Sequence, residues 1–238
     1  MVMTMTDNFP LIFQDVYKQY PGVQALEEVS FSIPTGQIVG LVGPNGSGKS
    51  TLMKLAAGLL RPSRGEVRVL GRTPGRWTKA RVAFMPEVDH LYPWMTVGQT
   101  IDFVSTFFPD WESDRARELL DLLELPAHRP VGKLSKGQRA RVRLLLTFAR
   151  SATLVLLDEP LSGIDPPSRT RVVNGILSGF RPESQSVIVS THEIFETESL
   201  FDRVIVLSGG RVSLDAEMDQ LRAGYGRSLR GVLEEVLP

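Results

Sequence analysis

The sequence predicts an α/β fold in which a mostly parallel sheet is flanked by helices. Apolar runs typical of strands alternate with segments of helical apolar spacing, which is the pattern of parallel strands joined by helices. Between about residues 88 and 150 the strand-like runs stop and only helical spacing remains. We therefore expect one domain over residues 1–238, with a helical subdomain inserted at residues 88–150.

The expected elements follow from apolar periodicity and from turn residues such as Pro21-Gly22 and Pro34-Thr35-Gly36. Strands are expected at Leu11–Val16, Val29–Ile33, Ile38–Val42, Glu66–Leu70, Arg81–Phe84, Leu154–Leu157, Val187–Val189 and Arg203–Leu207. Helices are expected at Lys49–Leu60, Thr96–Phe108, Glu112–Leu123, Ser135–Arg150 and Ser168–Phe180, with a short helix after Met218.

The composition is that of an ordinary globular domain with a substantial core. Of 238 residues, 42% are hydrophobic and 23% charged, with 27 basic and 27 acidic side chains. This balance gives no global attraction to nucleic acid, so no nucleic-acid partner is expected. The lack of cysteine excludes disulfides and thiolate chemistry. The start does not resemble a signal peptide and no apolar run reaches about 18 residues, so we expect a cytoplasmic protein.

A glycine-rich loop carries the strongest motif: Gly43-Pro44-Asn45-Gly46-Ser47-Gly48-Lys49-Ser50-Thr51 follows an apolar strand and opens a helix. Its glycines let backbone N–H groups point at phosphates, and the helix N-terminus favours negative charge. Lys49 is expected to reach the β- and γ-phosphates, and Ser50 to place its hydroxyl on Mg²⁺. The complete pattern disfavours a plain glycine-rich turn. The expected nucleotide contacts are Asn45, Gly46, Ser47, Gly48, Lys49, Ser50 and Thr51.

Polar groups also follow two later apolar strands. Asp158 and Glu159 come directly after one strand, and ligands bind at the carboxyl ends of parallel strands. Asp158 is expected to hold Mg²⁺ through water, and Glu159 to accept a proton from the attacking water. His192 closes the next strand, in reach of the γ-phosphate. Alone, each is typical of a polar loop; the preceding phosphate loop favours the catalytic interpretation.

The segment Leu134-Ser135-Lys136-Gly137-Gln138 resembles the Leu-Ser-Gly-Gly-Gln signature of ABC ATPases. These motifs in this order resemble the nucleotide-binding subunits of ABC transporters over nearly the whole chain. The resemblance implies a P-loop NTPase core of the ABC type, with an antiparallel β portion, that hydrolyses ATP with Mg²⁺. It also implies that Ser135, Gly137 and Gln138 bind the γ-phosphate of ATP held by a second ATPase subunit. As a local feature, Ser135 also predicts a helix N-cap.

Two further segments match the family. Tyr20 lies where the family has an aromatic side chain that stacks on adenine, with Tyr17 the less favoured candidate; a core or edge-strand role is the alternative for either. Ser162-Gly163-Ile164-Asp165 resembles the D-loop that touches the partner's site across the dimer. Without the resemblance, this segment is a turn before a helix that begins at Pro166-Pro167.

Two positions depart from the family pattern. Glu87 replaces the usual glutamine at the loop between core and insertion; a carboxylate can bind Mg²⁺ but cannot donate hydrogen bonds as an amide does. We expect Glu87 to contact metal and nucleotide and to couple them to a membrane partner. Lys136 replaces a common glycine; it opposes the helix dipole slightly, yet can reach phosphate or an acid at the interface. Both interpretations of Lys136 stay open.

The predicted function is an ATP-hydrolysing subunit that powers an ABC membrane transporter. The segments Leu91–Val97 and Phe107–Trp111 resemble bacterial drug- or antibiotic-efflux ABC ATPases, so export is expected. The subunit would sit on the inner face of the cell membrane through an integral membrane subunit. Leu91, Tyr92, Trp94 and Met95 either line a groove for that subunit or pack the insertion. A homodimer is simpler than a heterodimer; a soluble ABC ATPase acting as a nucleotide-dependent switch is the alternative.

Overall fold

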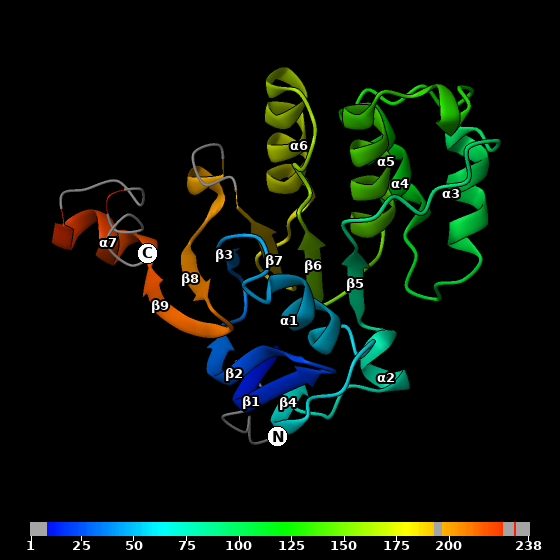
Figure 1. The fold of residues 1–238 in the computed structure, drawn as a ribbon. Helices are drawn as coiled ribbons and strands as arrows, with labels where there is room; N and C mark the ends of the chain where they lie inside the picture. Colours follow the sequence, from blue (N-terminus) through cyan, green and yellow to red (C-terminus); the bar gives the residue numbers. More distant parts are fainter. Residues whose placement is uncertain (1–8, 193–196, 226–230, 232–238) are drawn as a thin grey trace.

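The computed structural model describes residues 9–192, 197–225 and 231, and its strands form two sheets (Figure 1). The larger sheet has the strand order β5-β6-β7-β3-β8-β9, and the smaller has the order β2-β1-β4. The strands are β1 (Leu11–Tyr20), β2 (Val23–Ile33), β3 (Ile38–Val42), β4 (Arg64–Val69), β5 (Val82–Met85), β6 (Leu154–Asp158), β7 (Ser186–Thr191), β8 (Arg203–Ser208) and β9 (Arg211–Glu217). The helices are α1 (Lys49–Ala56), α2 (Arg76–Lys79), α3 (Val97–Ser105), α4 (Ser113–Leu122), α5 (Lys136–Phe148), α6 (Pro166–Gly179) and α7 (Met218–Tyr225).

The larger sheet is parallel except for its last strand. Strands β5, β6, β7, β3 and β8 run parallel, and β9 pairs antiparallel with β8. Strands β3, β6 and β7 are buried along their whole length, which explains the apolar runs Ile38–Val42, Leu154–Leu157 and Val187–Val189. The smaller sheet is entirely antiparallel. The predicted mixed α/β fold with an antiparallel β portion is thus confirmed.

Two apolar cores lie on opposite faces of the parallel sheet. One packs helix α1 and the antiparallel strands against residues such as Leu41 and Leu156. The other packs α5 and α6 against residues such as Leu157 and Val189. Adjacent residues of β6 therefore face different cores, and the strand ends in Asp158 at the edge where the phosphate loop also begins. This arrangement places the motifs side by side.

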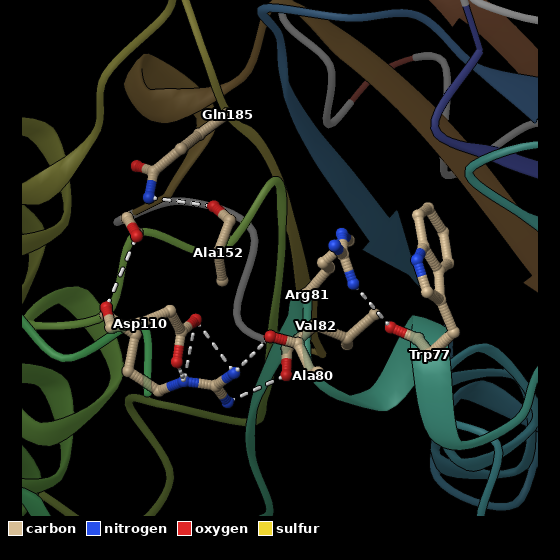
Figure 2. A network of polar contacts seen from close by, with 9 residues as sticks. Trp77, Ala80, Arg81, Val82, Asp110, Ala152 and Gln185 are labelled. Carbon is tan, nitrogen blue, oxygen red and sulfur yellow. Dashed lines mark hydrogen bonds and ion pairs between the residues drawn. The ribbon is translucent and has the colours of Figure 1, made fainter. Parts of the chain in front are cut away.

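Helices α3, α4 and α5 lie on the β5 side of the molecule (Figure 1) and fall between β5 and β6 in the chain. Arg150, only 4% exposed, ties the end of this segment to the core. Its guanidinium donates to the carbonyl oxygens of Val82 (2.9 Å) and Ala80 (3.0 Å) and pairs with Asp110 at 3.0 Å. Figure 2 shows Asp110, Ala80 and Val82 around this network of contacts. The Arg150 guanidinium also lies 4.0 Å from the Phe108 ring centroid.

The structure corrects several expected boundaries. Helix α1 ends at Ala56 instead of Leu60, because Gly58 adopts a left-handed φ of +68° that stops the helix. Strands β1 and β2 extend to a tight turn at Pro21-Gly22 and form a longer hairpin than predicted. Strand β9 and the four-residue helix α2 were not predicted. Met218 opens α7, as expected.

Candidate nucleotide-binding and catalytic site

The phosphate loop needs glycine for steric reasons. Gly48 has a φ of +107°, and a Cβ atom there would lie 2.7 Å from the Ala25 carbonyl oxygen. A Cβ atom on Gly43 would lie 2.2 Å from the Leu207 carbonyl oxygen. Both contacts are with backbone atoms that cannot turn aside, so only glycine allows this loop to close against β2 and β8.

The lysine of the loop is buried and points back into it. Lys49 is 5% exposed, and its ammonium donates to the carbonyl oxygens of Gly43 (2.7 Å) and Pro44 (3.1 Å). It also lies 3.4 Å from Glu159 Oε1. The loop therefore curls around a cation, and the buried lysine is directly linked to the predicted general base.

Two oxygen donors meet beside the loop. Ser50 Oγ lies 3.2 Å from Asp158 Oδ1, which also accepts a 2.7 Å hydrogen bond from Ser190 Oγ. Mg²⁺ prefers oxygen ligands and is held by one or two carboxylates together with substrate phosphates. The Ser50 and Asp158 pair is a donor set that suits this ion. No group of three His, Cys, Asp or Glu side chains gathers as a metal site within the described ranges.

The Glu159 carboxylate is held between two basic side chains. Its Oε1 faces Lys49, and its Oε2 lies 2.9 Å from His192 Nδ1. Glu159 has a φ of +47°, a conformation that costs a non-glycine residue about 1–3 kcal/mol. Its backbone N–H donates to Ser190 Oγ at 2.9 Å, which fixes this conformation. Strand β7 thus supports the backbone through Ser190, and His192, directly after this strand, is a partner for the carboxylate.

A cavity of about 500 Å³ opens over these groups. It contains most of the predicted nucleotide contacts together with three residues of β2. It is lined by Val23, Gln24, Ala25, Asn45, Gly46, Gly48, Lys49, Ser50, Thr51, Glu87, Glu159, Ser162 and His192. Ser47 is buried below the loop, so its side chain faces the protein and not the cavity.

Tyr20 lies beside this cavity. It pairs with Val23 across the β1–β2 hairpin, and Val23 lines the cavity wall. The Tyr20 ring is partly exposed and lies 5.2 Å from the Lys18 ammonium. The position is therefore next to the space that a base would fill, and adenine stacking by Tyr20 stays a prediction.

The signature-like segment lies away from this cavity, at the start of α5. Ser135 caps the helix as predicted, since its Oγ accepts from the Gln138 N–H at 3.1 Å. Gln138 Oε1 in turn accepts from the Ser135 N–H at 3.0 Å. Gly137 packs against α6, where a Cβ atom would lie 2.5 Å from Ser168 Cβ. The chain does not bring Ser135, Gly137 or Gln138 to its own phosphate loop.

The D-loop-like segment lies between the nucleotide cavity and the start of α5. Asp165 caps α6 by accepting from the Ser168 N–H at 3.1 Å, and this hydrogen bonding lowers the pKa of the Asp165 carboxyl. Prolines follow at the first helical positions, as predicted. The ammonium of Lys136 lies close to Gly163: a Cβ atom there would be 3.8 Å from Nζ. Both interpretations of Lys136 stay open. The structure adds that the Lys136 ammonium lies next to the D-loop-like segment.

Sequence reasoning missed Ser190 and Arg143. Ser190 pairs with Asp158 across β6 and β7, and a polar residue at the end of a strand next to the Asp-Glu strand was the available signal. Arg143 is buried in α5 and faces the boundary with the core. A charged residue among the apolar positions of a predicted helix was the signal there.

Comparison with known proteins gives the family. The family model described as ABC transporter matches residues 26–162, which hold the phosphate loop, the signature-like segment and β6. An ABC transporter ATP-binding protein of Synechocystis sp. is 30% identical over 226 residues, which are 90% of this chain and 64% of that protein. The SkfA peptide export ATP-binding protein SkfE of Bacillus subtilis is 33% identical over 213 residues, which are 87% of this chain and 89% of that protein.

The relatives include ATP-binding proteins named for export and others named for import. An aliphatic sulfonates import ATP-binding protein, SsuB of Escherichia coli, is 34% identical over 212 residues, which are 88% of this chain and 82% of that protein. A solved ATP-binding subunit of an ABC transporter superposes with a TM-score of 0.84 at 27% identity, covering 96% of this chain and 99% of that chain. With its phosphate loop, its Asp-Glu strand and its signature-like helix start in the family's order, the chain belongs to the ABC transporter ATP-binding family.

Proposed function

We propose that this chain hydrolyses ATP to power an ABC membrane transporter, with Glu159 as the general base. The observation that carries this proposal is the row formed by Lys49, Glu159 and His192 along the 500 Å³ cavity. A buried carboxylate between two basic groups, next to a phosphate loop, has the position required to take a proton from an attacking water.

Lys49 links binding to catalysis. A triphosphate entering the cavity competes with Glu159 for the Lys49 ammonium, 3.4 Å from Oε1. When the lysine turns to the phosphates, the Glu159 carboxylate is released to accept a proton from water, and His192 keeps it oriented through Oε2. Mg²⁺, when bound by Ser50 and Asp158, would offset charge on the β- and γ-phosphates. Stabilisation of charge by fixed groups of this kind is usually the largest single contribution to catalysis.

We propose that two such subunits form head-to-tail composite sites. The N-terminus of α5 carries a backbone suited to binding an anion, yet lies outside the cavity of its own chain. A second subunit that brings its signature-like segment over Asn45–Thr51 would complete each site. Because this chain holds both halves, we propose a homodimer, with pairing to a related chain as the other outcome.

We propose that an integral membrane subunit is the partner to which ATP hydrolysis is coupled. An exposed aromatic cluster lies on the insertion. It consists of Tyr92 (43% exposed), Trp94 (70%), Phe107 (61%) and Phe103. Neighbouring ring centroids in it lie 4.9 to 5.8 Å apart. Exposed apolar clusters mark interaction surfaces, and an amphipathic helix at the cytoplasmic end of a membrane subunit would fit this one. Among the described residues, no helix has the length and hydropathy to span a membrane.

We further propose export as the direction and the inner face of the cell membrane as the location. The segments Leu91–Val97 and Phe107–Trp111 support export through their resemblance to efflux ATPases, and SkfE is an exporter's ATP-binding protein. The import protein SsuB is equally similar, so transport itself must be measured. Inverted membrane vesicles accumulate a cargo that is exported and do not accumulate one that is imported.

The dimer is tested with Glu159→Gln. This variant should bind Mg-ATP without hydrolysing it and so accumulate as the closed pair. Light scattering at saturating Mg-ATP should give twice the monomer mass, and Mg-ADP should give the monomer. A monomer under both conditions would contradict the composite site for this chain alone.

The membrane partner is tested by affinity capture of the tagged chain from detergent-solubilised membranes of its own host. A polytopic membrane protein at stoichiometric amounts is expected. Trp94→Asp should lose this partner while keeping ATP hydrolysis, because Trp94 does not line the nucleotide cavity. Capture of only ribosomal or DNA-bound proteins would favour the alternative, a soluble nucleotide-dependent switch.

A further inference from the structure

Arg143 is a buried cation whose guanidinium is only partly satisfied by the residues that the structure describes. It lies in the second turn of α5 and is 9% exposed. Within the described part of the chain, its Nε and Nη2 atoms have no hydrogen-bond partner. A buried guanidinium loses water and normally regains the loss through hydrogen bonds or an ion pair. Burial accordingly lowers the pKa of the Arg143 side chain, while Asp89, Asp158 and Glu87 oppose that shift.

Arg143 lines a second cavity next to the nucleotide cavity. This space of about 180 Å³ lies between the α5 N-terminal half and the end of β6. Three residues, Glu87, Glu159 and Ser162, line both cavities. A side chain at this boundary can turn toward the phosphates or toward Arg143.

The neighbouring carboxylates differ in whether they already have partners. Asp89 pairs with Arg139 at 3.1 Å, and Glu159 is held by Lys49 and His192. Asp158 accepts from Ser50 and Ser190. Glu87, by contrast, is exposed and makes no hydrogen bond or ion pair with any described residue. The unmatched cation and the unmatched carboxylate thus share one cavity.

We propose that Arg143 is a positioning residue that draws the Glu87 carboxylate to the boundary of the two cavities and neutralises it there. The inference depends on the ATP site of the proposed function and not on the transport it drives. Without Arg143, Glu87 would add a third negative charge to Asp158 and Glu159 where the triphosphate must bind. The carboxylate at position 87 and the arginine at position 143 are therefore one functional unit.

The test is a double-mutant cycle on Mg-ATP affinity, measured with a fluorescent ATP analogue. Arg143→Met removes the charge at similar volume and should weaken binding about tenfold, which corresponds to the coupling expected once the two charges pair as proposed. Adding Glu87→Gln to that variant should restore affinity to within about threefold, because the neutral amide needs no cation. A merely structural arginine would leave the double variant as weak as Arg143→Met. That result would overturn the proposal.

The control cation is Arg139, which lines the same cavity but already pairs with Asp89. The effects of Arg139→Met and Glu87→Gln on Mg-ATP affinity should be additive. If Glu87→Gln also restored the affinity of Arg139→Met, the coupling would reflect general charge, and a specific unit of Arg143 and Glu87 would be overturned. Arg143→Lys should recover part of the lost affinity. Failure of the unchanged chain to bind Mg-ATP would instead refute the ATP site itself.

A stability measurement keeps the proposal testable if Arg143→Met does not fold. Glu87→Gln in the absence of nucleotide should lower the melting temperature by about 2 °C or more, since the buried Arg143 loses one of the three negative charges that act on it, Asp89, Asp158 and Glu87. Glu183→Gln, at another exposed position, should leave it unchanged. Equal melting temperatures for Glu87→Gln and the unchanged chain would contradict the pairing.

Discussion

The phosphate loop side of the molecule and its α5 side meet at the same edge of the parallel sheet, yet they are built differently. On the loop side, charged groups are matched with one another: Lys49 with Glu159, and Asp158 with Ser50 and Ser190. On the α5 side, Arg143 has two unmatched nitrogen atoms within the described residues, and the start of the helix faces away from the loop.

This difference follows from how each side is held. Strands β3, β6 and β7 are fully buried, so the groups at their ends are fixed by continuous hydrogen bonding and packing. The insertion instead packs through apolar side chains of α5 on one face of the sheet, and Arg150 adds polar contacts to the core. The loop side is therefore preorganised for chemistry, and the α5 side retains groups that a ligand or a second subunit can match.

The largest effect is expected on the loop side, from Glu159→Gln. Loss of a general base typically lowers kcat by about 10²–10⁴-fold, while Lys49 and the loop glycines still bind the nucleotide. Phosphate release should fall by this factor, with Mg-ATP affinity kept. Glu118→Gln, in an exposed pair with Arg115, serves as the control and should leave kcat unchanged. A kcat within threefold of the unchanged chain would remove Glu159 from the proposed chemistry.

The next effect concerns the attachment of the insertion. Arg150→Ala leaves the Asp110 carboxylate and the carbonyl groups of Ala80 and Val82 without their buried donor (Figure 2). Removing one member of a buried pair costs about 3–5 kcal/mol, which urea unfolding should record as a lower midpoint. Arg117→Ala breaks only the exposed pair with Asp114 and should cost less than about 1 kcal/mol. Similar losses in both variants would refute the special role of Arg150.

The same contrast explains what the sequence could predict. Motifs whose chemistry depends on neighbours in sequence were found: the loop 43–51, the pair Asp158-Glu159 and the Ser135 cap all lie where expected. Features that depend on residues far apart in the chain were missed. Ser190 supports Glu159 only because β6 and β7 pair, and Arg143 and Glu87 line one cavity only because α5 packs beside the end of β6. Strand β9 was missed because its half-exposed alternation is weaker than the buried runs.

A smaller effect tests how closely α5 must pack. Gly137 and Gly98 both occupy the second position of their helices, α5 and α3. A Cβ atom on Gly137 would lie 2.5 Å from Ser168 Cβ, whereas on Gly98 the nearest atom outside its own turn is 3.4 Å away. Gly137→Ala should therefore destabilise by about 1–3 kcal/mol, and Gly98→Ala should stabilise by up to about 1 kcal/mol.

These two variants are compared by urea unfolding, with Mg-ATP-dependent dimerisation as a second readout. Gly137→Ala should also weaken the dimer, because it displaces the signature-like segment. Ser168→Gly in the same chain removes the obstructing atom and should recover part of the stability. An unaffected Gly137→Ala would show that α5 can shift without cost, and would weaken the comparison between the two sides.

The smallest effect is a pH dependence at a second charged contact between insertion and core. Arg181, between α6 and β7, hydrogen-bonds to Glu112 at the start of α4 and lowers the pKa of that carboxyl. A carboxyl with a lowered pKa adds stability above its unfolded pKa, and this contribution is lost as the pH falls through the folded value. Both side chains are about one-third exposed, so solvent screening limits the pair to about 0.2–1 kcal/mol. The unfolding free energies of the unchanged chain and of Glu112→Gln should therefore differ at pH 7 and converge as Glu112 is protonated below its unfolded pKa. A difference that stays constant with pH would assign the effect of Glu112→Gln to packing. Arg150 would then be the principal charged link to the insertion.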